Sequence, residues 1–297
     1  MSGTGNRFLL PAACLFVLGA AGLVHAGTHA LLLTRDDVAR SGASVCELTI
    51  DLSAATCAIM PAGDDGLFAR ATVVCPDGGR APALTTVVDN ETLRATFSSG
   101  GSGSSDTETP DQQWIVEIGA SPLPTDFTLS CGSTQGSADL GGVALRSCSF
   151  LLQKSEWEIA WSAPVKEPVQ VLIASGSAST ITLADAGNAH PGACGILAAG
   201  TTATLDLGGA INPGDHAITM LLANGSARIA LPPGIGAAVA ARAYCSRIEV
   251  AGSGWQQRYR LPVRRAYRTD DYLSCDSTAT LDITAITAQI QITRDSR

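Results

Sequence analysis

Residues 218–231 read Ile218-Thr-Met-Leu-Leu-Ala-Asn-Gly-Ser-Ala-Arg-Ile-Ala-Leu231, with apolar side chains at alternate positions on both sides of an Asn-Gly-Ser step. Alternation with a period of two is typical of strands that bury one face. Variants of this unit recur at residues 48–60, 127–140, 169–183 and 281–292. A repeated unit of strand, small-residue turn and strand predicts a stacked β architecture.

The composition favours one large, well-buried β domain over residues 45–297. The 297 residues are 45% apolar and only 15% charged, which is the opposite of a disordered chain. Long amphipathic helical stretches are missing. The formal net charge of −8 argues against a general nucleic-acid binder.

Residues 1–26 are predicted to be a signal peptide. Arg7 supplies the positive start, residues 8–24 form an apolar run, and Ala26 ends a sequence suited to cleavage. The run is short for a hydrocarbon core of about 30 Å, so an uncleaved membrane anchor is the alternative. We therefore expect an extracytoplasmic protein, periplasmic, surface-bound or secreted, that meets a membrane only if this segment is retained.

Two further segments interrupt the strand pattern. Residues 27–44 carry several charged side chains and are predicted to be a lead-in spacer, partly helical. Residues 98–113 are rich in glycine and serine and are predicted to be a flexible loop inserted within the domain.

Cysteine use agrees with export. Once Cys14 is set aside with the signal, an even number of cysteines remains, namely Cys46, Cys57, Cys75, Cys131, Cys148, Cys194, Cys245 and Cys275. An even number behind a signal peptide predicts disulfides of undefined connectivity. Cys131 and Cys148 are the first pair to test, because they flank the turn at residues 139–142. A metal site is disfavoured because no Cys-x-x-Cys occurs, and buried free thiols are the other alternative.

The alternation also predicts buried faces and turns. In two strands we expect alternate residues to share one inward face: Leu48, Ile50 and Leu52 in the first, and Val169, Val171 and Ile173 in the second. Four glycines are expected where the backbone turns tightly, at Gly132, Gly136, Gly176 and Gly225. Cys57, Cys131 and Cys245 are expected at corresponding places in the repeat.

Motifs that carry chemistry are scarce. The sequence contains no G-x-S-x-G, no H-E-x-x-H and no P-loop, so no catalytic residue, cofactor or metal is assigned. One cluster of charge remains at residues 256–268, formed by Arg258, Arg260, Arg264, Arg265 and Arg268. These arginines either guard an edge strand against unwanted pairing or bind an anionic partner, since guanidinium groups match phosphate and carboxylate.

Three stretches of the chain resemble a known family. Trp-Ile-Val-Glu-Ile at 114–118, Pro-Leu-Pro-Thr-Asp-Phe-Thr-Leu at 122–129 and Ala-Asp-Leu-Gly-Gly-Val-Ala-Leu at 138–145 resemble the toast-rack domain family of bacterial envelope and cell-wall-active-antibiotic response proteins. Ala-Leu-Pro-Pro-Gly at 230–234 and Tyr-Arg-Thr-Asp-Asp-Tyr at 267–272 fit the same pattern. This chain has many more cysteines. The resemblance implies a right-handed, single-stranded β-solenoid over residues 45–293, without a known catalytic centre.

Two classes of function follow from these observations. The favoured one is a non-enzymatic envelope or surface protein, a rigid β scaffold for sensing, adhesion or protein interaction, with an envelope protein or a wall polymer as partner. The alternative is a carbohydrate-active β-helix enzyme acting on an anionic polysaccharide, which would need acidic and basic side chains converging on one groove. The sequence does not fix the oligomeric state.

Overall fold

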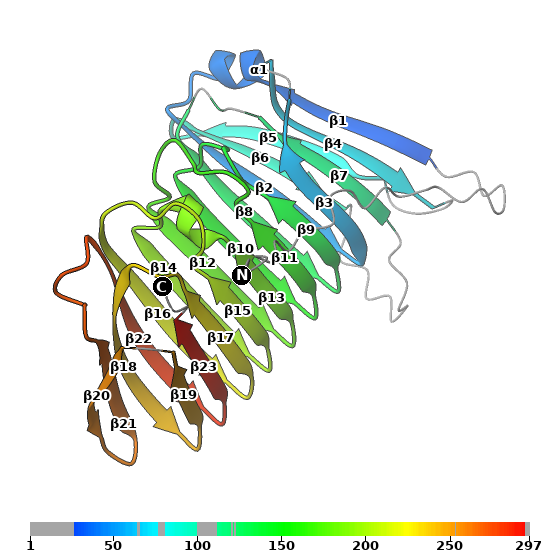
Figure 1. The fold of residues 1–297 in the computed structure, drawn as a ribbon. Coiled ribbons are helices and arrows are strands. Elements are labelled where there is room, and N and C mark those ends of the chain that lie inside the picture. Colours follow the sequence, from blue (N-terminus) through cyan, green and yellow to red (C-terminus); the bar gives the residue numbers. More distant parts are fainter. Residues whose placement is uncertain are drawn as a thin grey trace, which may run out of the picture.

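From residue 92 to residue 251, successive strands of the chain alternate between two facing β-sheets (Figure 1). This computed structural model describes residues 27–63, 66–76, 81–99, 112–119, 121, 123–252 and 254–294. The predicted all-β class is confirmed. The predicted signal segment and residues 100–111 of the predicted loop lie outside the described residues.

Each sheet is named here by its strands in spatial order. Sheet A has 11 strands: β1 (Gly27–Thr34), β4 (Leu67–Cys75), β7 (Gln112–Ile118), β3 (Ala55–Pro61), β9 (Gln135–Asp139), β11 (Glu156–Ala160), β13 (Thr180–Ala184), β15 (Thr202–Asp206), β17 (Ser226–Leu231), β23 (Gln289–Arg294) and β19 (Arg247–Ala251). Sheet B has 12 strands: β20 (Trp255–Arg260), β21 (Arg264–Thr269), β18 (Ile235–Tyr244), β22 (Ser277–Ile286), β16 (Gly214–Ala223), β14 (Ala193–Ala199), β12 (Val171–Ser177), β10 (Ser147–Gln153), β8 (Thr125–Gly132), β2 (Val45–Ser53), β6 (Thr92–Ser98) and β5 (Ala83–Asp89).

The central part of the molecule is a stack of coils, each made of one strand from sheet B followed by one from sheet A. Strands β8 to β17 form five successive coils, and each strand pairs in parallel with its equivalent in the next coil. Parallel neighbours in continuous register place equivalent residues of every coil in rows across the sheet. These rows explain why the sequence repeats.

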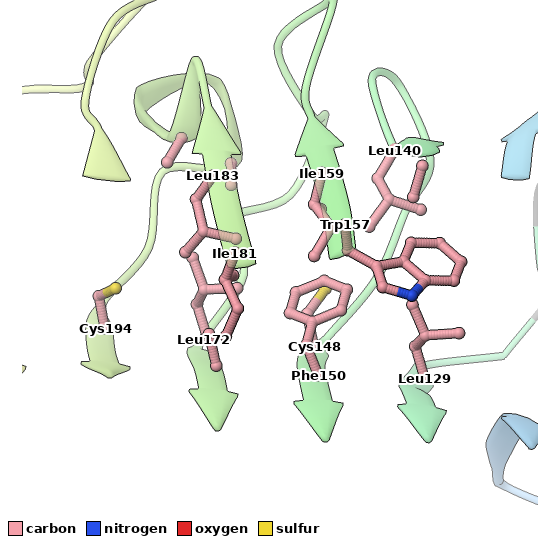
Figure 2. Close-up of a cluster of buried hydrophobic side chains, with 14 of the residues drawn as sticks. Leu129, Leu140, Cys148, Phe150, Trp157, Ile159, Leu172, Ile181, Leu183 and Cys194 are labelled. Atoms are coloured by element: carbon pink, nitrogen blue, oxygen red, sulfur yellow. The ribbon is translucent and has the colours of Figure 1, made fainter. Parts of the chain in front are cut away.

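Inward-facing rows form one core between the sheets. Leu172 of β12 lies in the row between Cys148 of β10 and Cys194 of β14, and all three side chains are buried (Figure 2). The ring of Phe150 makes edge-to-face contacts with Phe127 and Trp161, with centroids 6.2 and 6.4 Å apart. The contact with Phe127 joins adjacent coils, and the contact with Trp161 lies within one coil, so the core stabilises each coil both internally and through its neighbours.

One of the two predicted buried faces is wrong by one position. Leu48, Ile50 and Leu52 are buried as predicted. Val169, which precedes β12, is buried as predicted, but within β12 Leu172 and Ala174 are buried and Val171 is 40% exposed. The run from residue 171 to 174 is apolar on both faces, so periodicity could not choose the buried face; the row shared with Cys148 and Cys194 sets it instead.

The corners between sheets use left-handed backbone, mostly without glycine. The corner residues have φ between 49° and 59°: Ala54, Ser133, Lys154, Ala178, Gly200, Asn224, Cys245 and Thr287. Two of the four predicted turn glycines are required for another reason, since a Cβ on Gly136 would lie 2.5 Å from the carbonyl oxygen of Cys57 and one on Gly225 would clash with that of Thr201. These two glycines permit close approach of adjacent coils.

A ladder of buried hydroxyl groups follows the corners. The residue after each left-handed position is Thr134, Ser155, Ser179 or Thr201 in four consecutive coils. The N–H of Thr134 donates to Ser155 Oγ at 3.2 Å, and the N–H of Ser179 donates to Thr201 Oγ1 at 3.4 Å. The hydroxyls therefore accept N–H groups that the corner removes from the sheets.

At both ends of the stack, the spatial order of the coils differs from their order in the chain. The last coil, β22–β23, lies between β16–β17 and β18–β19, and β6–β7 lies outside β2–β3 at the other end. Beyond these coils the strands are antiparallel: β4 and β1 extend sheet A, β5 extends sheet B at the same end, and β21 and β20 extend sheet B at the other. Terminal caps of this kind shield the stack from end-to-end association.

Residues 27–44, predicted as a spacer, are part of the fold. Strand β1 pairs with β4 along its length, and helix α1 (Arg35–Arg40) follows with Thr34 as its N-cap. Val38 of this helix is fully buried. A 3-10 helix, η1 (Ala186–Ala189), is the other helical element of the described chain. No described helix has the length and apolar character needed to span a membrane.

Candidate functional site

The predicted arginine cluster lies on the antiparallel hairpin β20–β21, which forms the edge of sheet B beyond β18 (Figure 1). Strand β20 is the edge strand of that sheet, and β21 joins it to β18. A register shift between Gln257 and Tyr259 leaves Arg258 at a bulge. Bulges are frequent at sheet edges and turn the side chains away from regular alternation.

The hairpin divides the five arginines between its two faces. Arg264 lies opposite Arg242 of β18, and Arg268 lies opposite Ala238. Arg265 lies opposite buried Ala241, and it therefore points to the inner side. One face consequently carries Arg264, Arg268 and Arg242, a residue that the sequence analysis did not single out.

Arg265 has a structural role. Its Nη1 donates to the carbonyl oxygen of Ile248 at 3.1 Å. Ile248 belongs to β19, the edge strand of sheet A at this end. A side chain that occupies an edge carbonyl blocks pairing with another strand, and Arg265 does this at the edge of β19 in sheet A, not at the edge of its own sheet.

The other four hairpin arginines lie at the surface. Arg258, Arg260 and Arg264 are exposed, and Arg268 is half-buried, with its guanidinium 5.9 Å from the centre of the Tyr272 ring. None of these four forms an ion pair within the described part of the chain. We call Arg258, Arg260, Arg264 and Arg268 the basic hairpin cluster. Unpaired guanidinium groups on a protein of net charge −8 form a local positive field suited to an anion.

The cysteines do not form the predicted framework. The structure joins none of the described cysteines in a disulfide. Six are buried: Cys46, Cys57, Cys75, Cys131, Cys148 and Cys194. Cys245 is exposed at a corner, and Cys275 is partly exposed.

The pair expected first, Cys131 with Cys148, is excluded by register. On adjacent strands Cys131 lies opposite Leu152, and Cys148 lies opposite Phe127. The two cysteines are thus four residues apart along the strands, about 13 Å, whereas a disulfide needs Cα atoms within about 7 Å. The expected equivalence also fails, because Cys131 precedes a corner, Cys57 follows one and Cys245 occupies one.

Burial makes the inner thiols chemically inert. Loss of hydration raises the pKa of Cys46, Cys131 and Cys194 to about 12. It raises the pKa of Cys57 and Cys148 as well. A thiol with a raised pKa is a poor nucleophile and a poor metal ligand, and no group of three or more potential metal ligands is assembled in the described residues.

The outer face of sheet A is polar and shallowly grooved. One groove of about 370 Å³ lies over β9, β11 and β13 and is lined in part by Glu156 and Glu158. Another groove of about 360 Å³ lies over β15, β17, β23 and β19 and is lined in part by Arg228, Arg247 and Glu249. Arg247 and Glu249 form an ion pair with each other. In this second groove, the basic and acidic side chains of Arg247 and Glu249 therefore neutralise one another.

Comparison with known proteins yields likeness to solved structures only. No family model matches the chain, and no curated protein matches it. A candidate cell adhesion protein from Clostridium sporogenes has a TM-score of 0.44 and 15% identity, covering 91% of this chain and 100% of that one. A candidate adhesin from Bacteroides fragilis has a TM-score of 0.39 and 9% identity, covering 90% and 96%. Both scores are below 0.5, so function has to be inferred from the chain's own residues.

Proposed function

We propose that this chain is a non-enzymatic, extracytoplasmic surface protein, a rigid β scaffold that presents the basic hairpin cluster to an anionic partner. The observation that carries the proposal is the set of four arginines on β20 and β21 without ion-pair partners in the described chain. In a protein of net charge −8, such a cluster attracts a polyanion locally while the protein as a whole stays negatively charged.

The architecture supports the scaffold part of the proposal. Coils in continuous register share one core, and antiparallel strands cap both ends of the stack. Such a body holds the hairpin at a fixed position relative to both sheet faces. The stacked coils also support the toast-rack resemblance at the level of architecture, and a right-handed winding remains part of this proposal.

The partner class follows from the chemistry of arginine. Planar guanidinium groups bind phosphate, sulfate and carboxylate through paired N–H donors. An anionic wall polymer or an acidic patch on an envelope protein offers such groups in series. Binding through exposed arginines is screened by salt, with a Debye length of about 10 Å at 0.1 M ionic strength.

The test compares two double variants with equal loss of charge. R258Q/R260Q removes two arginines of the basic hairpin cluster, and R228Q/R247Q removes two from the groove on sheet A. Binding is measured on immobilised dextran sulfate, with neutral dextran as the blank and a salt gradient for elution. We expect R258Q/R260Q to elute at clearly lower salt and R228Q/R247Q to behave as the parent. Equal elution of both variants, or no retention of the parent, would overturn the proposal.

The enzyme alternative has one observation in its favour. Glu156 and Glu158 point to the same side of β11 and line the same groove, and residues two apart on a strand lie about 7 Å from each other. Two carboxylates on one groove are the kind of pair that glycosidases use. Release of reducing ends from anionic polysaccharides, lost in both E156Q and E158Q, would support it over the scaffold function.

A further inference from the structure

On the outer face of sheet B, one row of residues is uncharged along its centre and ends in opposite charges. This outward row crosses eight of the parallel strands of this sheet, from Asp51 on β2 to Arg242 on β18. The positions between them are uncharged: Ser130, Leu151, Ser175, Leu197, Leu221 and Thr284. The three leucines are 43–47% exposed. Leu197 and Leu221 are neighbours in the row, and Leu151 is separated from Leu197 by Ser175. Exposed apolar side chains gathered in this way favour an interaction surface.

The centre of the row is hollowed. Ser175 lies between Leu151 and Leu197, and its small side chain leaves an open groove of about 570 Å³ bordered by these leucines. A leucine from an opposing surface would fill part of this groove. The face therefore offers both a protruding side chain, Leu197, and a recess next to it.

We propose that this face binds a second copy of the chain about a two-fold axis that runs parallel to the strands, between β12 and β14. This operation places each row of one copy against the same row of the other copy in reverse order, so that the two stacks run in opposite directions. Leu197 of one copy then faces Ser175 of the other, and Leu151 faces Leu221. The axis lies at the middle of the 12-stranded sheet.

The neighbouring rows are complementary in size under the same operation. In the row two residues earlier, Ile173 of β12 pairs with Gly195 of β14, so the large side chain of each copy faces the glycine of the other. In the row two residues later, Tyr244 at one end would face Ser53 at the other. Large side chains opposite small ones allow two faces to pack without voids.

Charge selects the direction of the two stacks. In the proposed arrangement Asp51 of one copy faces Arg242 of the other, and the pair occurs twice in the dimer. Neither residue has an ion-pair partner within the described ranges of the chain. The opposite arrangement, with the stacks in the same direction, would place Asp51 against Asp51 and Arg242 against Arg242, which is unfavourable.

The area is sufficient for a specific dimer. Eight strands about 4.8 Å apart and seven residues of about 3.3 Å outline roughly 800 Å² on each copy. Specific interfaces bury about 800 Å² per partner. The inference goes beyond the proposed function, because Arg258 and Arg260 lie on β20, outside these eight strands.

The first test is the mass of the purified protein in solution, followed by sedimentation velocity from low nanomolar to high micromolar concentration. We expect a reversible dimer. L197E should raise the dissociation constant at least about 30-fold, as removal of a central interface residue does. T202E, on the opposite face of the same coil, is the matched control and should leave it unchanged. A monomeric parent, or a dimer unaffected by L197E, would overturn the interface.

The second test fixes the orientation. D51R and R242D should each weaken the dimer about 10-fold or more, because like charges then face each other in both copies of the pair. The double variant D51R/R242D restores opposite charges and should recover the parent dissociation constant. Failure of the double variant to recover it would overturn the antiparallel arrangement. R258Q/R260Q should dimerise as the parent does, which separates this result from that of the anionic-partner proposal.

Discussion

The backbone N–H of Ser155 donates to the hydroxyl of Ser179 in the next coil, at 3.2 Å. The Ser179 hydroxyl in turn lies 2.9 Å from the carbonyl oxygen of Ser177, to which it donates. Both serines are buried at the corner where the chain passes from sheet B to sheet A. A buried N–H without an acceptor is costly, so each corner depends on the hydroxyl of the coil beside it.

We therefore expect S179A to destabilise the fold by about 1–3 kcal/mol, the cost of a buried donor left without its acceptor. S177A, two residues away and exposed, should change the free energy of unfolding by less than about 0.5 kcal/mol. Urea denaturation followed by circular dichroism measures both. Equal stabilities of the two variants would show that the hydroxyl ladder contributes nothing.

Close contact between coils makes a second prediction. A methyl group on Gly225 would clash with the carbonyl oxygen of Thr201, whereas one on Gly132 would meet no atom within 4 Å. G225A should lose about 1–3 kcal/mol or more, as overpacking does, and G132A should be close to neutral. Thermal denaturation of the two variants checks this, and a G225A protein as stable as the parent would contradict the packing of these coils.

The third prediction concerns the ion pair between Arg294 and Asp271, whose Nη2 and Oδ2 atoms are 2.7 Å apart. The Arg294 side chain is 8% exposed and that of Asp271 is 30% exposed. D271N should cost about 2 kcal/mol at pH 6, less than a fully buried pair, because Asp271 is partly solvated.

The loss of stability caused by D271N should depend on pH. The hydrogen bond from Arg294 lowers the pKa of Asp271 below its usual value, about 3.9 in an unfolded chain. A lowered pKa in the folded state contributes stability above pH 4, and this contribution is lost as the pH falls through the folded-state pKa. The gap between parent and D271N should therefore narrow between pH 6 and pH 3. A constant gap in urea denaturation at both pH values would refute this assignment.

The fourth prediction separates thiols from disulfides. Cys245 is exposed, whereas Cys46, Cys131 and Cys194 are buried, with pKa values that burial raises to about 12. Iodoacetamide should therefore alkylate Cys245 in the folded protein and reach the buried cysteines only after denaturation. Peptide mapping by mass spectrometry gives the result. Disulfide-linked peptides that contain a buried cysteine would restore the predicted framework.

Much of the fold could be predicted from local patterns, but the spatial order of the coils could not. The alternation at residues 48–52 identified a buried face, because Leu48, Ile50 and Leu52 are separated by polar residues. The insertion of β22–β23 between two earlier coils leaves no such trace. All coils present similar small and apolar edges, so local sequence does not determine which two become neighbours.

The candidate site shows the same division. The concentration of arginines at residues 258–268 is visible in the sequence, and it coincides with an edge hairpin. The bulge at Arg258 and the pairing of Arg264 with Arg242 decide which side chains share a face. Both depend on strand register, which is set by long-range pairing. Arg242 lies among alanines in the sequence, and its charge at an outward-facing position was the only indication that it belongs to the site.

The central claim is that this chain is an exported surface scaffold, and the intact mass of the natural protein tests it most directly. The protein is recovered separately from the cytoplasm and from the envelope and medium of the cells that make it, and its N-terminus is determined by mass spectrometry. We predict that it is found outside the cytoplasm and that its mass corresponds to a chain beginning at Gly27. A cytoplasmic protein that retains residues 1–26 would contradict the account.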